Sequence, residues 1–185
     1  MVHSLNLETD RLMLRPINLL DAPAIKAGAS NRKVAEAMLS IPHPYPEKEA
    51  ERYISSQIAG FETGYSVTFV IERKFVKVFS GIIEIRSIER EHSQAELSFW
   101  LVFEEWGKGY MTEALKPVLH FSFENLNLNR LYAYHMVRNV ASGRVLQKNG
   151  FMREGVLKQR VRKWGVLEDA ALWAILREDW QGSAS

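Results

Sequence analysis

The chain has 185 residues, 46% of them hydrophobic and 25% charged, a composition that suits one ordinary globular domain, residues 1–185. It has no cysteine, which excludes disulfide bonds and thiolate sites, and its 24 basic and 22 acidic residues give no case for binding nucleic acid or an anionic membrane. Because no run of about 18 apolar residues predicts a membrane span and no secretory signal pattern begins the chain, we expect a cytoplasmic protein.

In its first half, the chain predicts one strand, two helices and two further strands, in that order. Residues 11–17 alternate between apolar and polar side chains, which indicates a strand. A short helix is expected within residues 18–30, and a second helix begins near Pro46, after prolines that disfavour regular structure. Residues 65–73 and 77–89 are rich in β-branched and aromatic side chains and predict two strands joined by a turn.

The second half of the chain predicts strand, helix, strand, helix and a final pair of strands. The first of these strands, residues 95–102, places Leu97, Phe99 and Leu101 on one face and the alternating residues on the other. After a loop with two glycines, a helix begins near Tyr110. The remaining elements are a buried strand at residues 130–137, a helix at 139–150, and strands at 151–163 and 166–176. This order predicts an α+β fold around one central, partly antiparallel sheet.

The stretch "WGKGYMTEA", residues 106–114, joins a predicted strand to a predicted helix. The first turn of a helix leaves N–H groups unpaired and carries partial positive charge, so it binds anions. Gly107 and Gly109 let a ligand approach the backbone without meeting a Cβ, while Lys108 adds positive charge and Thr112 a hydroxyl group. Alone, the pattern fits a structural tight turn equally well. It lacks the third glycine of the dinucleotide-binding fingerprint and does not match a Walker loop.

Three motifs, "AELSFWL", "WGKGYMTEAL" and "NVASGRVLQKNGF", occur in order along the chain and resemble the GNAT superfamily of N-acetyltransferases. The chain looks most like the branch that includes the bacterial ribosomal-protein N-terminal acetyltransferases. "LETDRLMLRPI" and "PHPYPEKEAERYI" are similar to the same branch, so the resemblance covers nearly the whole chain. It implies a GNAT-like α+β fold, with a central mixed, mostly antiparallel sheet of about seven strands and about four helices.

The resemblance implies acetyl-coenzyme A (acetyl-CoA) as acetyl donor, with its pyrophosphate on the backbone of the glycine loop. Its pantetheine arm is expected to pair with backbone groups where two strands diverge, and a backbone N–H near Leu101 to polarise the thioester carbonyl. The wider superfamily often has Gln or Arg at the position of Trp106 and Gly or Ala at that of Met111, changes that an anion held by backbone groups tolerates. The residues expected to bind the coenzyme are Trp100, Leu101, Val102, Trp106, Gly107, Lys108, Gly109, Tyr110, Met111, Thr112, Asn139, Ser142 and Arg144. For Arg144 and the nearby Lys148, ordinary helix-surface charge is the alternative.

Acetyl transfer to an amine needs a neutral amine and a proton for the leaving thiolate. In the branch that this chain resembles, a serine donates that proton, and Ser142 matches it, whereas the tyrosine more frequent in the superfamily falls at Leu146. The alternative for Ser142 is a helix-start residue that satisfies backbone groups.

Glu96 is the candidate base, directly or through water, and its alternative is a structural carboxylate that orients the amine or pairs with an arginine. The glutamate that some relatives have in the sixth strand matches Val161 here and does not carry over.

Two further polar residues are expected to lie outside the chemistry. Glu84 alternates with Ile83 and Ile85 and is expected to face solvent rather than substrate. His135 lies in a strand with large side chains on both faces and is expected to be a satisfied core histidine. The five histidines show no metal-binding spacing, so no metal is predicted.

The acceptor is expected to be a primary amine, either a protein or peptide N-terminus or a small-molecule amine, acetylated by direct transfer. The alternatives are a non-catalytic sensor that binds coenzyme A, and an unrelated α+β protein whose glycine loop is structural. A homodimer is expected by resemblance alone, and neither a nucleic acid nor a membrane is expected as a partner.

Overall fold

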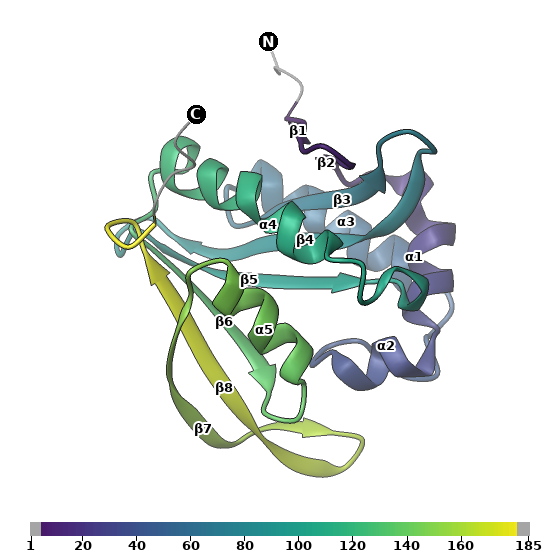
Figure 1. Cartoon of the computed structure of the whole chain (residues 1–185). Helices are drawn as coiled ribbons and strands as arrows, with labels where there is room; N and C mark the ends of the chain where they lie inside the picture. The colour runs from purple at the N-terminus through teal and green to yellow at the C-terminus, as the bar shows by residue number, and fades with distance from the viewer. Residues whose placement is uncertain (1–4, 181–185) are drawn as a thin grey trace.

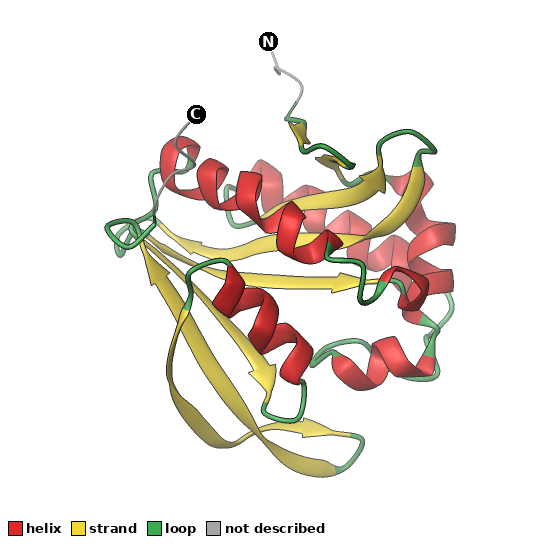
Figure 2. Cartoon of the chain, in the orientation of Figure 1, coloured by secondary structure: helices red, strands yellow, loops and turns green. Residues whose placement is uncertain are grey.

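The computed structural model describes residues 5–180, so residues 1–4 and 181–185 of the expected domain lie outside the described part. The described strands form one mixed sheet with helices on both faces (Figures 1 and 2). The strands are β1 (Leu7–Glu8), β2 (Leu12–Pro16), β3 (Val67–Arg73), β4 (Val78–Glu89), β5 (Gln94–Leu101), β6 (Arg130–Met136), β7 (Met152–Lys163) and β8 (Val166–Leu176). The α-helices are α1 (Ala22–Ala29), α2 (Arg32–Ala37), α3 (Glu49–Glu62), α4 (Tyr110–His120) and α5 (Val140–Lys148). Short helical segments are η1 (Leu19–Asp21), η2 (Phe103–Glu105) and η3 (Phe121–Asn125).

The order of strands and α-helices predicted from the sequence is confirmed, and the structure adds one short strand and one short α-helix to it. These are β1, a two-residue strand that pairs with β2, and α2, a six-residue helix between α1 and α3. Asn31 caps α2 by accepting a hydrogen bond from the N–H of Lys33 (3.0 Å). An Asn followed by six residues without glycine or proline is the signal in the sequence that predicts such a helix.

Neighbouring strands are antiparallel except for β5 and β6, in the order β1-β2-β3-β4-β5-β6-β8-β7. The parallel pairing ends early, and its last pair joins Glu96 to Tyr132. Beyond it β5 continues along β4 as far as Leu101, and β6 continues along β8 as far as Met136. The two strands therefore diverge inside the sheet, as Figure 1 shows. Backbone groups on their facing edges are left without a strand partner among the described strands.

Apolar side chains pack on both faces of the sheet. Leu115 of α4 packs with Leu97 of β5 on the face that α4 and α5 cover. Ile25 of α1 and Ile54 of α3 pack on the opposite face. The alternation predicted for β5 is confirmed, because Leu97 belongs to the α4 side whereas Trp100 packs on the α1 side. No helix within residues 5–180 is long and apolar enough to cross a membrane.

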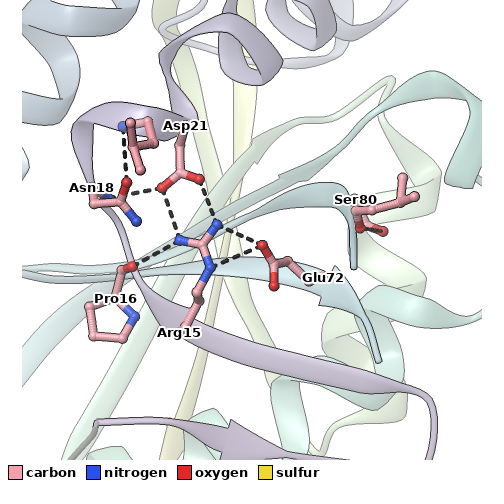
Figure 3. A network of polar contacts seen from close by, with 8 residues as sticks. Arg15, Pro16, Asn18, Asp21, Glu72 and Ser80 are labelled. Carbon is pink, nitrogen blue, oxygen red and sulfur yellow. Dashed lines mark hydrogen bonds and ion pairs between the residues drawn. The ribbon is translucent and has the colours of Figure 1, made fainter. Parts of the chain in front are cut away.

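A polar network around Arg15 of β2 ties the start of α1 to the sheet (Figure 3). The guanidinium donates two hydrogen bonds to Asp21 (2.6 and 3.0 Å) and two to Glu72 of β3 (2.6 and 3.0 Å). Asp21 also accepts a hydrogen bond from the N–H of Asn18 (2.9 Å), whose side-chain oxygen accepts one from the N–H of Leu20 (2.9 Å). These bonds fix the turn before α1, and α1 forms part of the site described below.

Replacing Asp21 by alanine is expected to lower the free energy of unfolding by about 1.5–3 kcal/mol. Asp21 is buried, and its loss leaves Arg15 with one carboxylate and removes an acceptor from the turn before α1. Urea unfolding followed by circular dichroism measures the change. Asp10 is exposed and lies two residues before β2, so Asp10→Ala is the matched control. Its expected change is below about 0.5 kcal/mol. Equal effects of the two substitutions contradict a stabilising role for the network.

Candidate active site

A cleft of about 410 Å³ opens where β5 and β6 diverge. It is bounded by the end of β5, the loop that follows, the start of α4, the end of α2 and one side of α5. Most residues expected to bind the coenzyme line it: Trp100, Leu101, Trp106, Gly107, Gly109, Tyr110, Met111, Thr112, Asn139, Ser142 and Arg144. The sequence did not predict the contribution of Val34, Ala37 and Met38, because these belong to α2 and its end.

Val102 and Lys108 were also expected to bind the coenzyme, but they lie outside the lining of the cleft. The N–H of Val102 donates to the carbonyl of Ser80 (2.9 Å), and the Nζ of Lys108 donates to Glu105 (2.9 Å). Successive residues of a strand direct their N–H groups to opposite edges. The N–H of Leu101 therefore points away from β4, toward the place where β6 has diverged, which is the orientation needed to polarise a carbonyl in the cleft.

The loop before α4 presents its backbone amides to the cleft. Gly107 and Gly109 have φ angles of 74° and 78°, a left-handed conformation that favours glycine. The N–H of Glu113 donates to the carbonyl of Gly109 (3.1 Å). Within residues 5–180, the preceding amides, from Gly107 to Thr112, donate to no protein group. These N–H groups lie at the positive end of a helix and are free to bind an anion.

Glu105, a buried carboxylate in η2, holds this loop in place. Its side chain pairs with Lys108 (2.9 Å) and with Arg73 of β3 (3.5 Å). The indole N–H of Trp106 donates to the carbonyl of Leu101 (3.0 Å), which fastens the loop to the end of β5. Because Lys108 is paired with Glu105, the main-chain amides supply most of the positive potential that the loop offers to the cleft.

Asn139 caps α5 and thereby positions Ser142. Its side-chain oxygen accepts a hydrogen bond from the N–H of Ser142 (3.2 Å), and its amide nitrogen donates to the carbonyl of Ala37 in α2 (3.1 Å). Ser142 lines both the cleft and a smaller cavity of about 30 Å³ that Glu96 also lines. Within residues 5–180 the Ser142 hydroxyl makes no hydrogen bond, so Asn139 and not Ser142 is the side chain that caps this helix.

A second space, of about 290 Å³, lies on the face of the sheet that α1 and α3 cover, and we call it the α3 pocket. Acidic, aromatic and apolar side chains line it, among them Glu84 of β4, Tyr53 of α3 and Trp100 of β5. Trp100 and Met38 line both the cleft and the α3 pocket. The two spaces therefore lie next to each other beside β5, with these two residues in both linings.

Arg86 of β4, which lines the α3 pocket, lies between two carboxylates. Its guanidinium is 2.5 Å from an oxygen of Glu96 and 3.9 Å from an oxygen of Glu84. Glu96 thus has the arginine partner that its structural alternative requires. Glu84 is only 8% exposed, so the expectation that it faces solvent is wrong, because α3 covers that face of the sheet. Burial raises the pKa of Glu84 above its usual value, although Arg86 opposes the shift.

His135 of β6 is a satisfied core histidine, as expected. Its Nε2 accepts a hydrogen bond from the indole N–H of Trp173 (2.8 Å), and its Nδ1 lies 2.8 Å from the carbonyl of Met136. Since a carbonyl only accepts, we assign the ring proton to Nδ1. Burial lowers the pKa of His135, which favours this neutral form. Among the described residues, no three His, Cys, Asp or Glu side chains are grouped so that they could hold a metal ion.

The fold and the site together are those of an acyltransferase, with free backbone amides on a cleft and a second pocket next to it. The family model described as acetyltransferase (GNAT) domain matches residues 11–152, most of the chain. The chain therefore belongs to the GNAT acetyltransferases, enzymes that use acetyl-CoA as the acetyl donor.

Related proteins agree with this assignment. The chain is 34% identical over 176 residues to the uncharacterized N-acetyltransferase YoaA of Bacillus subtilis (strain 168), covering 92% of this chain and 96% of YoaA. The structure of RimL, a ribosomal L7/L12 alpha-N-protein acetyltransferase in complex with coenzyme A, matches with a TM-score of 0.84 at 21% identity and covers 91% of this chain and 95% of RimL. Spermidine N-acetyltransferase from Vibrio cholerae, in complex with coenzyme A and spermine, matches with a TM-score of 0.81 at 24% identity, covering 92% and 98%. At these identities the two structures show the shared fold.

Proposed function

We propose that this protein moves the acetyl group of acetyl-CoA directly to a primary amine, with a protein or peptide N-terminus as the acceptor. The free amides from Gly107 to Thr112 carry the proposal, because they offer an anion site on a cleft that shares Met38 and Trp100 with the α3 pocket. The diphosphate of the coenzyme is an anion of the kind that such amides bind. Membership of the GNAT family supports acetyl-CoA as the donor.

In this proposal, the main chain binds and orients the donor. Trp100 and Leu101 present backbone groups to the pantetheine arm, and the N–H of Leu101 polarises the thioester carbonyl. Arg144 and Lys148 line the cleft from α5 and add positive charge for the phosphates. Ser142 gives a proton to the leaving thiolate. In this arrangement neither Val102 nor Lys108 contacts the donor directly. Glu96 forms an ion pair with Arg86.

A small polyamine is the second candidate acceptor. RimL acts on a ribosomal protein, whereas the spermidine acetyltransferase acts on a small amine, and both share this fold. The α3 pocket contains two carboxylates, Glu49 and Glu84, which suit an acceptor with more than one positive charge. The resemblance of the motifs around Gly107 and Ser142 to the ribosomal-protein branch favours the protein N-terminus. Cytoplasmic location and a homodimer remain predictions.

Release of the coenzyme thiol from acetyl-CoA tests the proposal. Because the chain has no cysteine, a thiol reagent reports the coenzyme alone. The acceptors are short peptides with a free N-terminus, the same peptides with an acetylated N-terminus, and spermidine. We expect release only with the free peptides, whereas release with spermidine alone supports the second candidate. Binding of acetyl-CoA without release by any amine contradicts an enzymatic role and supports the sensor alternative.

A further inference from the structure

Glu84 is a buried carboxylate that lines the α3 pocket. It lies on β4 directly opposite Ser98 of β5, and Arg86 lies opposite Glu96. Side chains alternate along both strands, so these four share the face that α1 and α3 cover. At 8% exposure, Glu84 is largely removed from bulk water yet lines the pocket. It is therefore placed to meet a ligand that enters there.

Arg86 does not neutralise its two carboxylate neighbours equally. It is hydrogen-bonded to Glu96 at 2.5 Å, while 3.9 Å separates its nearest nitrogen from Glu84. With both carboxylates ionised, the three side chains sum to one negative charge. Because Glu96 is the closer partner, that charge lies mainly on Glu84, on the side of the pocket. A desolvated negative charge of this kind attracts a cation.

Polar side chains of α3 line the α3 pocket together with Glu84. The Oε1 of Gln57 accepts a hydrogen bond from the hydroxyl of Thr68 (2.8 Å), which leaves its NH₂ group to donate elsewhere. Gln57 and Tyr53 line the same pocket as Glu84, and their donor groups lower the pKa of that carboxyl. Trp100 adds an aromatic surface to the same pocket, and cations bind to such surfaces. A buried carboxylate in a pocket that an aromatic ring also lines is suited to an alkylammonium group.

We infer that Glu84 binds the ammonium group of the acceptor and takes its proton, whereas Glu96 is a positioning residue that holds Arg86. This role rests on the proposed function and assigns its base. Trp100 and Met38 line both the α3 pocket and the cleft, so the inference places the amine at Glu84 in the space next to the one that holds the donor. Glu96 is already committed to the guanidinium that it contacts.

The chemistry balances with the groups present. Glu84 removes one proton from R–NH₃⁺, which gives a neutral amine and a neutral carboxylic acid. The nitrogen lone pair forms the C–N bond to the acetyl carbon, and the C–S bond breaks with its electron pair on sulfur. A second proton leaves the nitrogen and reaches sulfur through the hydroxyl of Ser142. Glu84 then returns its proton to water, so ammonium and thioester become amide, thiol and one proton.

The surroundings of Glu84 favour this task. Burial raises the pKa of Glu84, the charge of Arg86 lowers it, and the charge of Glu96 on β5 raises it again. The hydrogen bonds from Gln57 and Tyr53 on α3 lower it. The net effect is a raised pKa, and a carboxylate with a higher pKa is a stronger base for an ammonium proton while it is ionised.

The variants Glu84→Gln and Glu96→Gln separate the two roles when kcat/KM is measured against pH with the acceptor that the wild type acetylates. In the wild type, we expect kcat/KM to fall as the pH drops through a midpoint above 4.5, the ordinary glutamate pKa. Glu84→Gln is expected to lower kcat/KM about 100-fold and to remove this acidic limb. Glu96→Gln is expected to keep the limb but to move it to lower pH, because removing the Glu96 charge lowers the pKa of Glu84.

Folding and donor binding provide the controls. The raised pKa means that ionised Glu84 costs stability at neutral pH, so Glu84→Gln is expected to keep or raise the melting temperature and to leave the Kd of acetyl-CoA unchanged. Glu84→Asp retains a carboxylate and is expected to restore the acidic limb. An acidic limb that persists in Glu84→Gln, or one that disappears in Glu96→Gln instead, overturns the inference. Failure of the wild type to acetylate any amine overturns the proposed function as well.

Discussion

Ser142→Ala is expected to lower kcat about 1,000-fold, or about 4 kcal/mol of transition-state stabilisation, while changing the Kd of acetyl-CoA by less than about twofold. The thiolate that leaves when the amide forms needs a proton, and alanine has none to give. Ser142 lines the cleft, and its hydroxyl makes no hydrogen bond within residues 5–180. Its removal therefore breaks no bond of the folded protein, because the cap of α5 comes from the side chain of Asn139.

Single-turnover rates of thiol release measure this effect, and isothermal titration with acetyl-CoA measures the affinity. Ser142→Thr is the matched control, because it keeps a hydroxyl at the same position and is expected to retain most of the rate. A melting temperature equal to that of the wild type shows that the fold is intact. If Ser142→Ala releases thiol as fast as the wild type, Ser142 is not the proton donor, and the helix-start role becomes its explanation.

The sequence predicted which face of a strand each side chain takes, but not what covers that face. The alternation of residues 95–102 is seen in β5, and the same rule placed Glu84 opposite the apolar residues Ile83 and Ile85. The inference that Glu84 faces solvent failed because α3 packs over that side of the sheet. Contacts between elements far apart in the sequence decide this, and periodicity within one strand carries no information about them.

In the glycine loop, too, the sequence predicted the local structure but not the contacts of the side chains. Its place between a strand and a helix follows from local pattern, and the left-handed angles of Gly107 and Gly109 agree with the use of glycine there. The charge of Lys108 was assigned to the ligand, but Glu105, three residues earlier, pairs with it. The helix α2 was not predicted, since it has only six residues. For the same reason the sequence did not show that Met38, at the end of α2, lines the cleft.

Gly109→Val is expected to weaken acetyl-CoA binding about 100-fold, because a side chain at this position stands between the coenzyme diphosphate and the free amides. Each hydrogen bond to a charged group contributes about 1.5–3 kcal/mol, so the loss of one or two accounts for the change. A Cβ at Gly109 meets only Arg11, at 3.8 Å, so the protein itself has room for it. The remaining cost is backbone strain at a φ of 78°, about 1–2 kcal/mol of stability.

Gly165→Val separates strain from blocked binding. Gly165 has a φ of 86°, a Cβ there meets nothing within 4 Å, and it lies in the β7–β8 turn, outside the lining of the cleft. Both variants are expected to lose similar stability, but only Gly109→Val is expected to lose affinity for acetyl-CoA in titration calorimetry.

S-acetylpantetheine, which lacks the diphosphate, provides a second comparison of the two variants. With this donor, kcat/KM is expected to be similar in Gly109→Val and Gly165→Val, because neither variant alters the part of the cleft that it occupies. Equal affinity of the two variants for acetyl-CoA contradicts the placement of the diphosphate on this loop.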